Sequence, residues 1–169
     1  MNRELKVVIF YVLVFILQVL VEGGVFRDMA VHFCLLPLII AALPYKWKIP
    51  ALLPVAFLLG LALDMASGGV PGVNSAAATL VAALRNPVYV KLVANDNALP
   101  AQTPYSSIIG HAYYLKYIAI LTAIYVAAWL LMDSFSMASP LLMLLRLIVW
   151  TAASCAVSFV FNLVIGQRH

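Results

Sequence analysis

The chain has 169 residues, of which 66% are hydrophobic and only 9% are charged, and its formal net charge is +4. A soluble domain carries about 25% charged residues, so this composition leaves too few charges to cover a surface that faces water. We therefore predict an all-α integral membrane protein with a single transmembrane domain over residues 1–169, and the sparse basic residues exclude a nucleic-acid-binding surface.

Apolar runs along the chain predict a bundle of six membrane-spanning helices. A helix that crosses a membrane needs about 20 residues, so the second and fourth runs are short by this rule. We expect these two helices to tilt little, to extend into their flanks or to be buried among their neighbours. The predicted spans are residues 5–21, 29–43, 49–66, 72–84, 114–132 and 140–166.

The distribution of Lys and Arg predicts how the spans are oriented. If the N-terminus lies in the cytoplasm, most of the ten basic residues fall in cytoplasmic segments, and Arg27 is the one in an outer segment. Cytoplasmic loops of membrane proteins are enriched in Lys and Arg. The pattern therefore predicts a multi-pass protein with both termini in the cytoplasm.

The longest connection between predicted spans is residues 85–111. Most of this connection, "RNPVYVKLVANDNALPAQTPYSS", mixes Pro, Asn, Asp, Gln and Ser and predicts a cytoplasmic loop. Two interpretations of residues 87–93 stay open. In the first, residues 87–93 lie along the membrane surface. In the second, they continue the fourth helix past a kink at Pro87.

Polar residues inside apolar spans are costly and mark candidate sites. At a rise of about 1.5 Å per residue, Asp64 lies roughly 6 Å and Arg146 roughly 9 Å below the outer ends of their helices. His32, Asn74 and Gln18 are predicted in the same outer half. We consider two arrangements: an ion pair between Asp64 and Arg146 that holds the bundle together, and an outward-facing polar pocket. The pocket would be lined by Asp64, Arg146, Asn74 and His32.

Catalytic motifs are absent from the sequence. It contains neither the H-E-x-x-H pattern of zinc proteases nor the G-x-S-x-G pattern of serine hydrolases, and its two cysteines lack the spacing of a zinc site. The glycine-rich "SGGVPG" lacks the Lys-Ser/Thr of a nucleotide-binding loop. We therefore predict no catalytic, cofactor-binding or metal-binding residue and no enzymatic activity, with Asp64 as an organiser of the bundle.

Residues 57–84, "FLLGLALDMASGGVPGVNSAAATLVAAL", predict a helical hairpin. The glycines and proline of "SGGVPG" allow the chain to reverse within a few residues. Asn74 or Ser75 is expected to cap the second helix by accepting its unpaired N–H groups. The small residues that follow let the backbones of neighbouring helices approach closely, so this helix is expected to be central.

This hairpin resembles the signature segment of the family of the rod-shape-determining protein MreD. The likeness covers about 28 residues, and the rest of the chain matches the family only in hydropathy and length. The loop after Arg85 is longer than is usual for the family. The shared positions are Gly60, Asp64, Ser67, Gly68, Gly72 and Asn74.

The resemblance implies a non-enzymatic scaffold or adaptor in the cytoplasmic membrane, in the complex that elongates the peptidoglycan wall of rod-shaped bacteria. It implies binding to an MreC-like single-span protein, together with an MreB-like actin filament, a RodA-like glycosyltransferase and a penicillin-binding transpeptidase. It also implies a fold similar to the substrate-binding subunits of energy-coupling-factor transporters. The alternative function is a vitamin-like small-molecule-binding subunit of a transporter, which the outer polar residues would suit.

Overall fold

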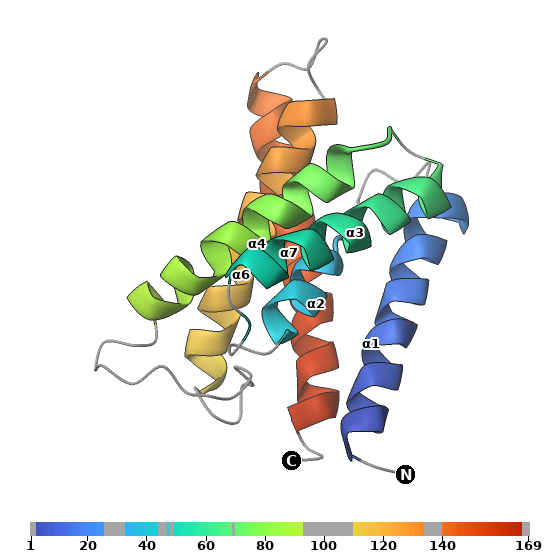
Figure 1. Ribbon diagram of the computed structural model, residues 1–169. Coiled ribbons are helices and arrows are strands. Elements are labelled where there is room, and N and C mark those ends of the chain that lie inside the picture. Colours follow the sequence, from blue (N-terminus) through green and yellow to red (C-terminus); the bar gives the residue numbers. More distant parts are fainter. Residues whose placement is uncertain are drawn as a thin grey trace.

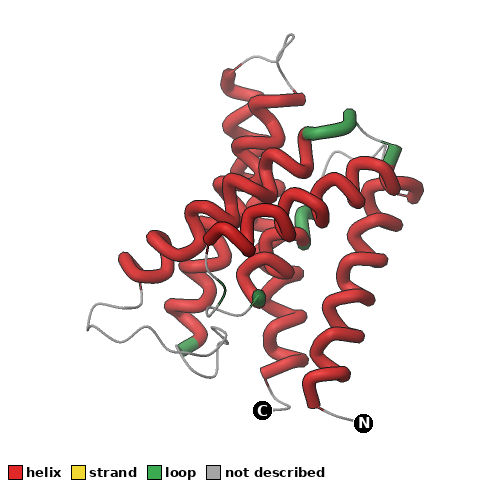
Figure 2. Tube along the Cα trace, in the orientation of Figure 1, coloured by secondary structure: helices red, strands yellow, loops and turns green. Residues whose placement is uncertain are grey.

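The computed structural model describes residues 3–25, 33–43, 47, 49–68, 70–92, 110–133 and 140–166. Within these ranges the chain forms helices joined by short loops and turns, and contains no strand (Figure 2). The elements in chain order are α1 (Arg3–Leu20), the π-helical turn η1 (Val21–Val25), α2 (Leu36–Ala42), α3 (Ile49–Ser67), α4 (Val73–Leu92), α6 (His111–Asp133) and α7 (Pro140–Gly166).

Three of the described helices are long and apolar enough to cross a membrane. They are α3, residues His111–Met132 of α6, and residues Leu141–Phe161 of α7. The prediction of an all-α chain with membrane-spanning helices is confirmed to this extent. For these three helices the observed bounds differ from the predicted spans by at most three residues at either end. The predicted second span, residues 29–43, is wrong at residues 33–35, which are not helical, and its described helix is the seven-residue α2.

The helices pack in a connected order. The α3–α4 pair forms an antiparallel hairpin with the most extensive contact in the molecule, α4 also packs against α6, and α6 packs against α7. The short α2 lies against α4 and α6, and α1 stands at one side and touches α2 and α3 (Figure 1). The start of α1 and the end of α7 lie at the same end of the molecule, and the α3–α4 turn lies at the opposite end (Figure 1).

The fourth helix is longer than its predicted span of residues 72–84. It continues through Pro87 to Leu92, so the interpretation in which the helix passes the proline is correct, and residues 85–92 are helical instead of part of a loop. Proline removes one backbone hydrogen bond, but Tyr89 on the next turn is fully buried against Tyr117 of α6. Packing against α6 thus extends the helix beyond the proline.

Arg85 was expected at the start of a cytoplasmic loop, but its side chain is fully buried in α4. Its Nη1 donates hydrogen bonds to the carbonyl oxygens of Ile40, at 2.8 Å, and Leu43, at 3.0 Å. The last carbonyl groups of a helix lack partners within the helix and carry partial negative charge. Arg85 therefore closes the C-terminal end of α2 and ties it to α4.

Gly60 sets the closest approach between α3 and α4. A Cβ atom added at this position would lie 2.4 Å from the Cα of Ser75 and 2.6 Å from the carbonyl oxygen of Asn74. Both of these atoms belong to the backbone of α4, so they cannot move aside as a flexible side chain would. The small residues of α4 beyond this point, Ala77, Ala78 and Ala82, are fully buried. The tightly packed hairpin predicted for residues 57–84 is observed.

We predict that Gly60→Ala destabilises the protein by about 1–3 kcal/mol, because the added methyl group forces the two helix backbones apart. The matched control is Ala62→Val, which adds more atoms at an exposed position of the same helix. Unfolding free energies measured in mixed detergent micelles should fall for Gly60→Ala and stay within about 0.5 kcal/mol for the control. Equal stability of the two variants would contradict the close contact.

Candidate functional site

Asp64 lies in the last turn of α3, and its side chain is buried. The carboxylate accepts three backbone hydrogen bonds from the start of α4: from Gly72 at 2.9 Å, Asn74 at 3.0 Å and Ser75 at 3.2 Å. The first N–H groups of a helix have no partner within the helix and carry partial positive charge. Asp64 therefore caps α4 from the neighbouring helix.

This cap differs from the one expected from sequence. Gly72 directly precedes α4 and has no side chain, so the acceptor comes from eight or more residues earlier in the chain. The hydroxyl of Ser75 donates to the carbonyl oxygen of Gly72 at 3.0 Å, and the side chain of Asn74 turns toward other helices. The prediction that Asn74 or Ser75 supplies the cap is wrong, although the capped helix is the expected one.

Two glycines make this geometry possible. Gly68 has a φ of +66° and Gly72 a φ of +103°, both in the left-handed region that residues with a Cβ rarely adopt. Gly68 and Gly72 therefore form the turn.

Ser67 is buried at the end of α3. A Cβ added at Gly23 of η1 would lie 3.5 Å from the Cα atom of Ser67, so Ser67 lies where η1 packs against α3.

Asn74 connects the hairpin to two further elements. Its Oδ1 accepts a hydrogen bond from the hydroxyl of Tyr125 on α6, and its Nδ2 donates to Oε2 of Glu22 in η1 at 3.1 Å. Glu22 also accepts at Oε1 from Nε2 of Gln18 at 2.6 Å. The Oε1 of Gln18 in turn accepts from the backbone N–H of Leu35 at 2.7 Å. We refer to Gln18, Glu22, Asp64, Asn74 and Tyr125 as the polar cluster.

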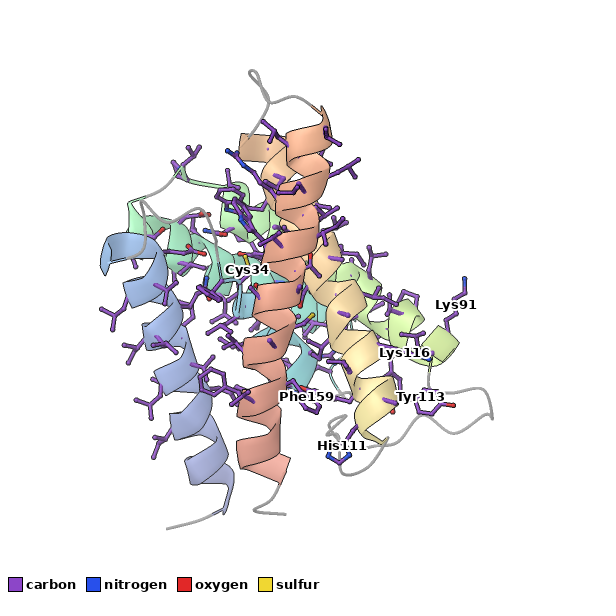
Figure 3. All side chains as sticks on the ribbon, turned by 180° about the vertical axis from the view of Figure 1, so that it is seen from behind. Cys34, Lys91, His111, Tyr113, Lys116 and Phe159 are labelled. Atoms are coloured by element: carbon purple, nitrogen blue, oxygen red, sulfur yellow. The ribbon has the colours of Figure 1, made fainter. Side chains whose placement is uncertain are left out.

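The polar cluster joins the segments that surround it. Its side chains come from α1, η1, α3, α4 and α6, and the bond to Leu35 adds the segment before α2. Next to Leu35, the backbone N–H of Cys34 donates to the hydroxyl of Ser154 on α7 at 2.8 Å. Cys34 lies in the interior between these helices (Figure 3). Polar bonds of this kind hold helices together where apolar surfaces alone give little orientation.

The structure brings together only part of the predicted set. Asp64 and Asn74 lie in the cluster, whereas Arg146 is exposed on α7 and makes no hydrogen bond or ion pair with the residues that the structure describes. His32 lies outside the described residues. The outward-facing pocket stays a prediction, whereas among the described residues the Asp64–Arg146 ion pair is not formed. The reason is that the start of α4 supplies the positive end that the Asp64 carboxylate requires.

Glu22 was not among the predicted site residues. The available signal was its position four residues after Gln18, a spacing that places two side chains on one face of a helix. In the described part of the chain, no group of three or more His, Cys, Asp or Glu side chains gathers where a metal ion could bind. The bonds of the cluster connect helices and leave Asp64 with three donors already on its carboxylate.

A comparison of the chain with protein-family models, with curated proteins and with solved structures finds no match in any of the three.

We predict that Asp64 and Arg146 act independently on stability. Asp64→Asn should lower the free energy of unfolding by about 1–3 kcal/mol, because the start of α4 loses a charged acceptor. Arg146→Gln should change it by no more than about 0.5 kcal/mol, because the side chain is exposed. The double variant should equal the sum of the two within about 0.5 kcal/mol.

A double-mutant cycle in mixed micelles measures this additivity. A coupling energy well above 1 kcal/mol would indicate that Asp64 and Arg146 form an ion pair and would contradict the backbone cap. In that case Arg146→Gln alone should lower the free energy of unfolding more than the double variant does.

Proposed function

We propose that the chain is a non-enzymatic scaffold of the bacterial cell-elongation complex and that it binds an MreC-like single-span membrane protein. The observation that supports this proposal is the hairpin. The positions that resemble the MreD signature are also those that build the α3–α4 unit: Gly60 at the helix contact, Asp64 at the cap, and Gly68 and Gly72 in the turn.

The geometry of Asp64 favours a structural role over catalysis. An acid that works in general acid–base chemistry must reach a proton on a substrate. The carboxylate of Asp64 is buried and already accepts three backbone N–H groups, so it holds the hairpin in place. The polar cluster likewise bonds to itself and to backbone groups, so it gives no specific support to the alternative of a vitamin-like ligand in a transporter subunit.

In this proposal the chain crosses the cytoplasmic membrane six times, with a fold similar to that of energy-coupling-factor binding subunits. The start of α1 and the end of α7 lie at one end of the molecule, which supports an even number of crossings. The proposal that this end faces the cytoplasm rests on the distribution of Lys and Arg along the sequence. The MreB-like filament, the RodA-like glycosyltransferase and the penicillin-binding transpeptidase are the proposed neighbours in the same complex.

The outward surface suits a partner helix within the bilayer. Large apolar side chains are exposed on α1, α3 and α7, among them Leu13, Leu58 and Ile148. Without a hydrophobic drive between helices in lipid, a partner helix is held by shape and by occasional polar bonds. Single cysteines at these three positions therefore report which face lies next to a partner.

We predict that the chain co-purifies in mild detergent with the MreC-like protein encoded by the same genome. A single cysteine at Leu13, Leu58 or Ile148, in a background that lacks Cys34 and Cys155, should cross-link to one cysteine in the partner's membrane helix. One of the three faces should dominate, and the other two serve as matched controls. Purification of the chain alone, with partner localisation and cell shape unchanged after its deletion, would contradict the proposal.

A further inference from the structure

Arg146 is the one charged residue in the sequence of α7. It lies in the apolar stretch Leu141–Phe161, which is long enough to cross a membrane, and its side chain is exposed. It makes no hydrogen bond or ion pair with the described residues. A charged side chain within a membrane-spanning helix is costly unless a partner compensates its charge. Arg146 therefore requires a partner that the described part of the chain does not supply.

The length of α7 places Arg146 near one edge of the bilayer. The helix has 27 residues and is therefore about 40 Å long, whereas the hydrocarbon core of a bilayer is about 30 Å thick. Arg146 lies six residues after Pro140, about 9 Å from the helix start. Side chains on a helix point back toward its N-terminal end. The guanidinium group therefore reaches toward the lipid headgroups while the backbone of Arg146 stays among the lipid chains.

The surface around Arg146 is apolar and open. Leu142, one turn before it, and Val149, three residues after it, lie on the same face of α7, and both are exposed. The start of α7 and the end of α6 project beyond the α3–α4 hairpin, at the end of the molecule opposite the chain termini (Figure 1). Lipid chains therefore have access to Leu142 and Val149, and their headgroups lie at the level of the guanidinium group.

We propose that Arg146 binds the phosphate group of an anionic phospholipid, such as phosphatidylglycerol, whose acyl chains lie along Leu142 and Val149. A guanidinium group matches the geometry of phosphate oxygens and donates two parallel hydrogen bonds to them. In a zwitterionic lipid the ammonium of the headgroup competes with Arg146 for the phosphate, so a lipid without an ammonium binds more tightly. The inference requires only that α7 crosses the membrane, and it does not depend on the proposed scaffold function.

A lipid phosphate suits this position better than a carboxylate on the membrane helix of a partner protein. A carboxylate on such a helix would meet Arg146 within the apolar layer, where both charges lose their hydration. The position of Arg146 near the helix start instead allows the guanidinium group to stay in contact with the headgroup layer. The phosphate is already in that layer and loses less hydration when it binds.

Two tryptophans next to this face provide a local probe. Trp150 lies one turn after Arg146, and its ring packs edge to face against Trp129 of α6 with ring centroids 5.6 Å apart. The chain has three tryptophans, so Trp47→Phe leaves only these two. The full chain is placed in phosphatidylcholine vesicles that contain increasing fractions of brominated phosphatidylglycerol or brominated phosphatidylcholine. Quenching of the tryptophan fluorescence reports which lipid lies next to the two rings.

In Trp47→Phe we expect brominated phosphatidylglycerol to bind next to the two rings about fivefold more tightly than brominated phosphatidylcholine. This ratio corresponds to ~1 kcal/mol for one basic residue beside anionic lipid. In the same background, Arg146→Gln should lower the ratio to about one, and Arg146→Lys should keep part of it. The matched control is Lys116→Gln, which removes an exposed charge near the start of α6 and should leave the ratio unchanged (Figure 3).

Equal quenching by the two lipids in Trp47→Phe, or a preference that survives Arg146→Gln, would overturn the inference. The first comparison leaves Arg146 in place, so it decides the question even if Arg146→Gln does not fold. A preference that appears only in Asp133→Asn would mean that Arg146 pairs with the residue that ends α6, and it would also overturn the inference. The same holds if neither lipid is preferred and Arg146→Gln abolishes co-purification with a membrane protein.

Discussion

The hydrogen bonds from the start of α4 to Asp64 are the interaction on which the hairpin depends. A carboxylate in apolar surroundings is costly unless donors compensate its charge, and unpaired backbone N–H groups at a helix start are costly in the same surroundings. The two costs cancel because each group is the partner of the other. The turn glycines, Gly68 and Gly72, bring the carboxylate and the N–H groups together. Gly60 allows the backbones of α3 and α4 to pack closely next to this turn.

The position of Asn74 follows from the same cap. Because its backbone N–H is fixed by Asp64, its side chain projects from the first turn of α4 toward η1 and α6. One amide then accepts from Tyr125 and donates to Glu22, so the hairpin end becomes the meeting point of several helices. The two acids of the cluster have separate roles: Asp64 fixes the hairpin, and Glu22 belongs to the junction that holds α1.

Hydropathy and helix-boundary residues predicted the long helices well. Pro140 opens α7, and the glycines after Ser67 end α3, close to where the sequence placed them. The similar predicted depths of Asp64 and Arg146 in the membrane suggested an ion pair, and that prediction was wrong. Depth takes no account of backbone donors that lie only eight to eleven residues after Asp64 in the chain. A side-chain cation looked like the natural partner, and the N-terminus of the next helix proved to be the actual one.

The remaining misses depended on tertiary contacts. Arg85 has the charge of a residue at a membrane boundary, and its burial makes sense only once the carbonyl groups at the end of α2 lie beside it. The extension of α4 past Pro87 likewise depends on the packing of Tyr89 against α6. Glu22 follows an apolar run and is drawn into the cluster by Asn74, a residue 52 positions later in the chain. The spacing of Gln18 and Glu22 places both side chains on one helix face, but no local pattern indicates the contact between Glu22 and Asn74.

The most direct test of the account is amide hydrogen exchange at the start of α4 in the full chain. The account predicts that the N–H groups of Gly72, Asn74 and Ser75 exchange slowly. It also predicts that Asp64→Asn speeds the exchange of these amides while the amides in the middle of α4 keep their protection. Exchange at these positions as fast as at the exposed Val70, or protection unchanged in Asp64→Asn, would contradict the cap on which the hairpin depends.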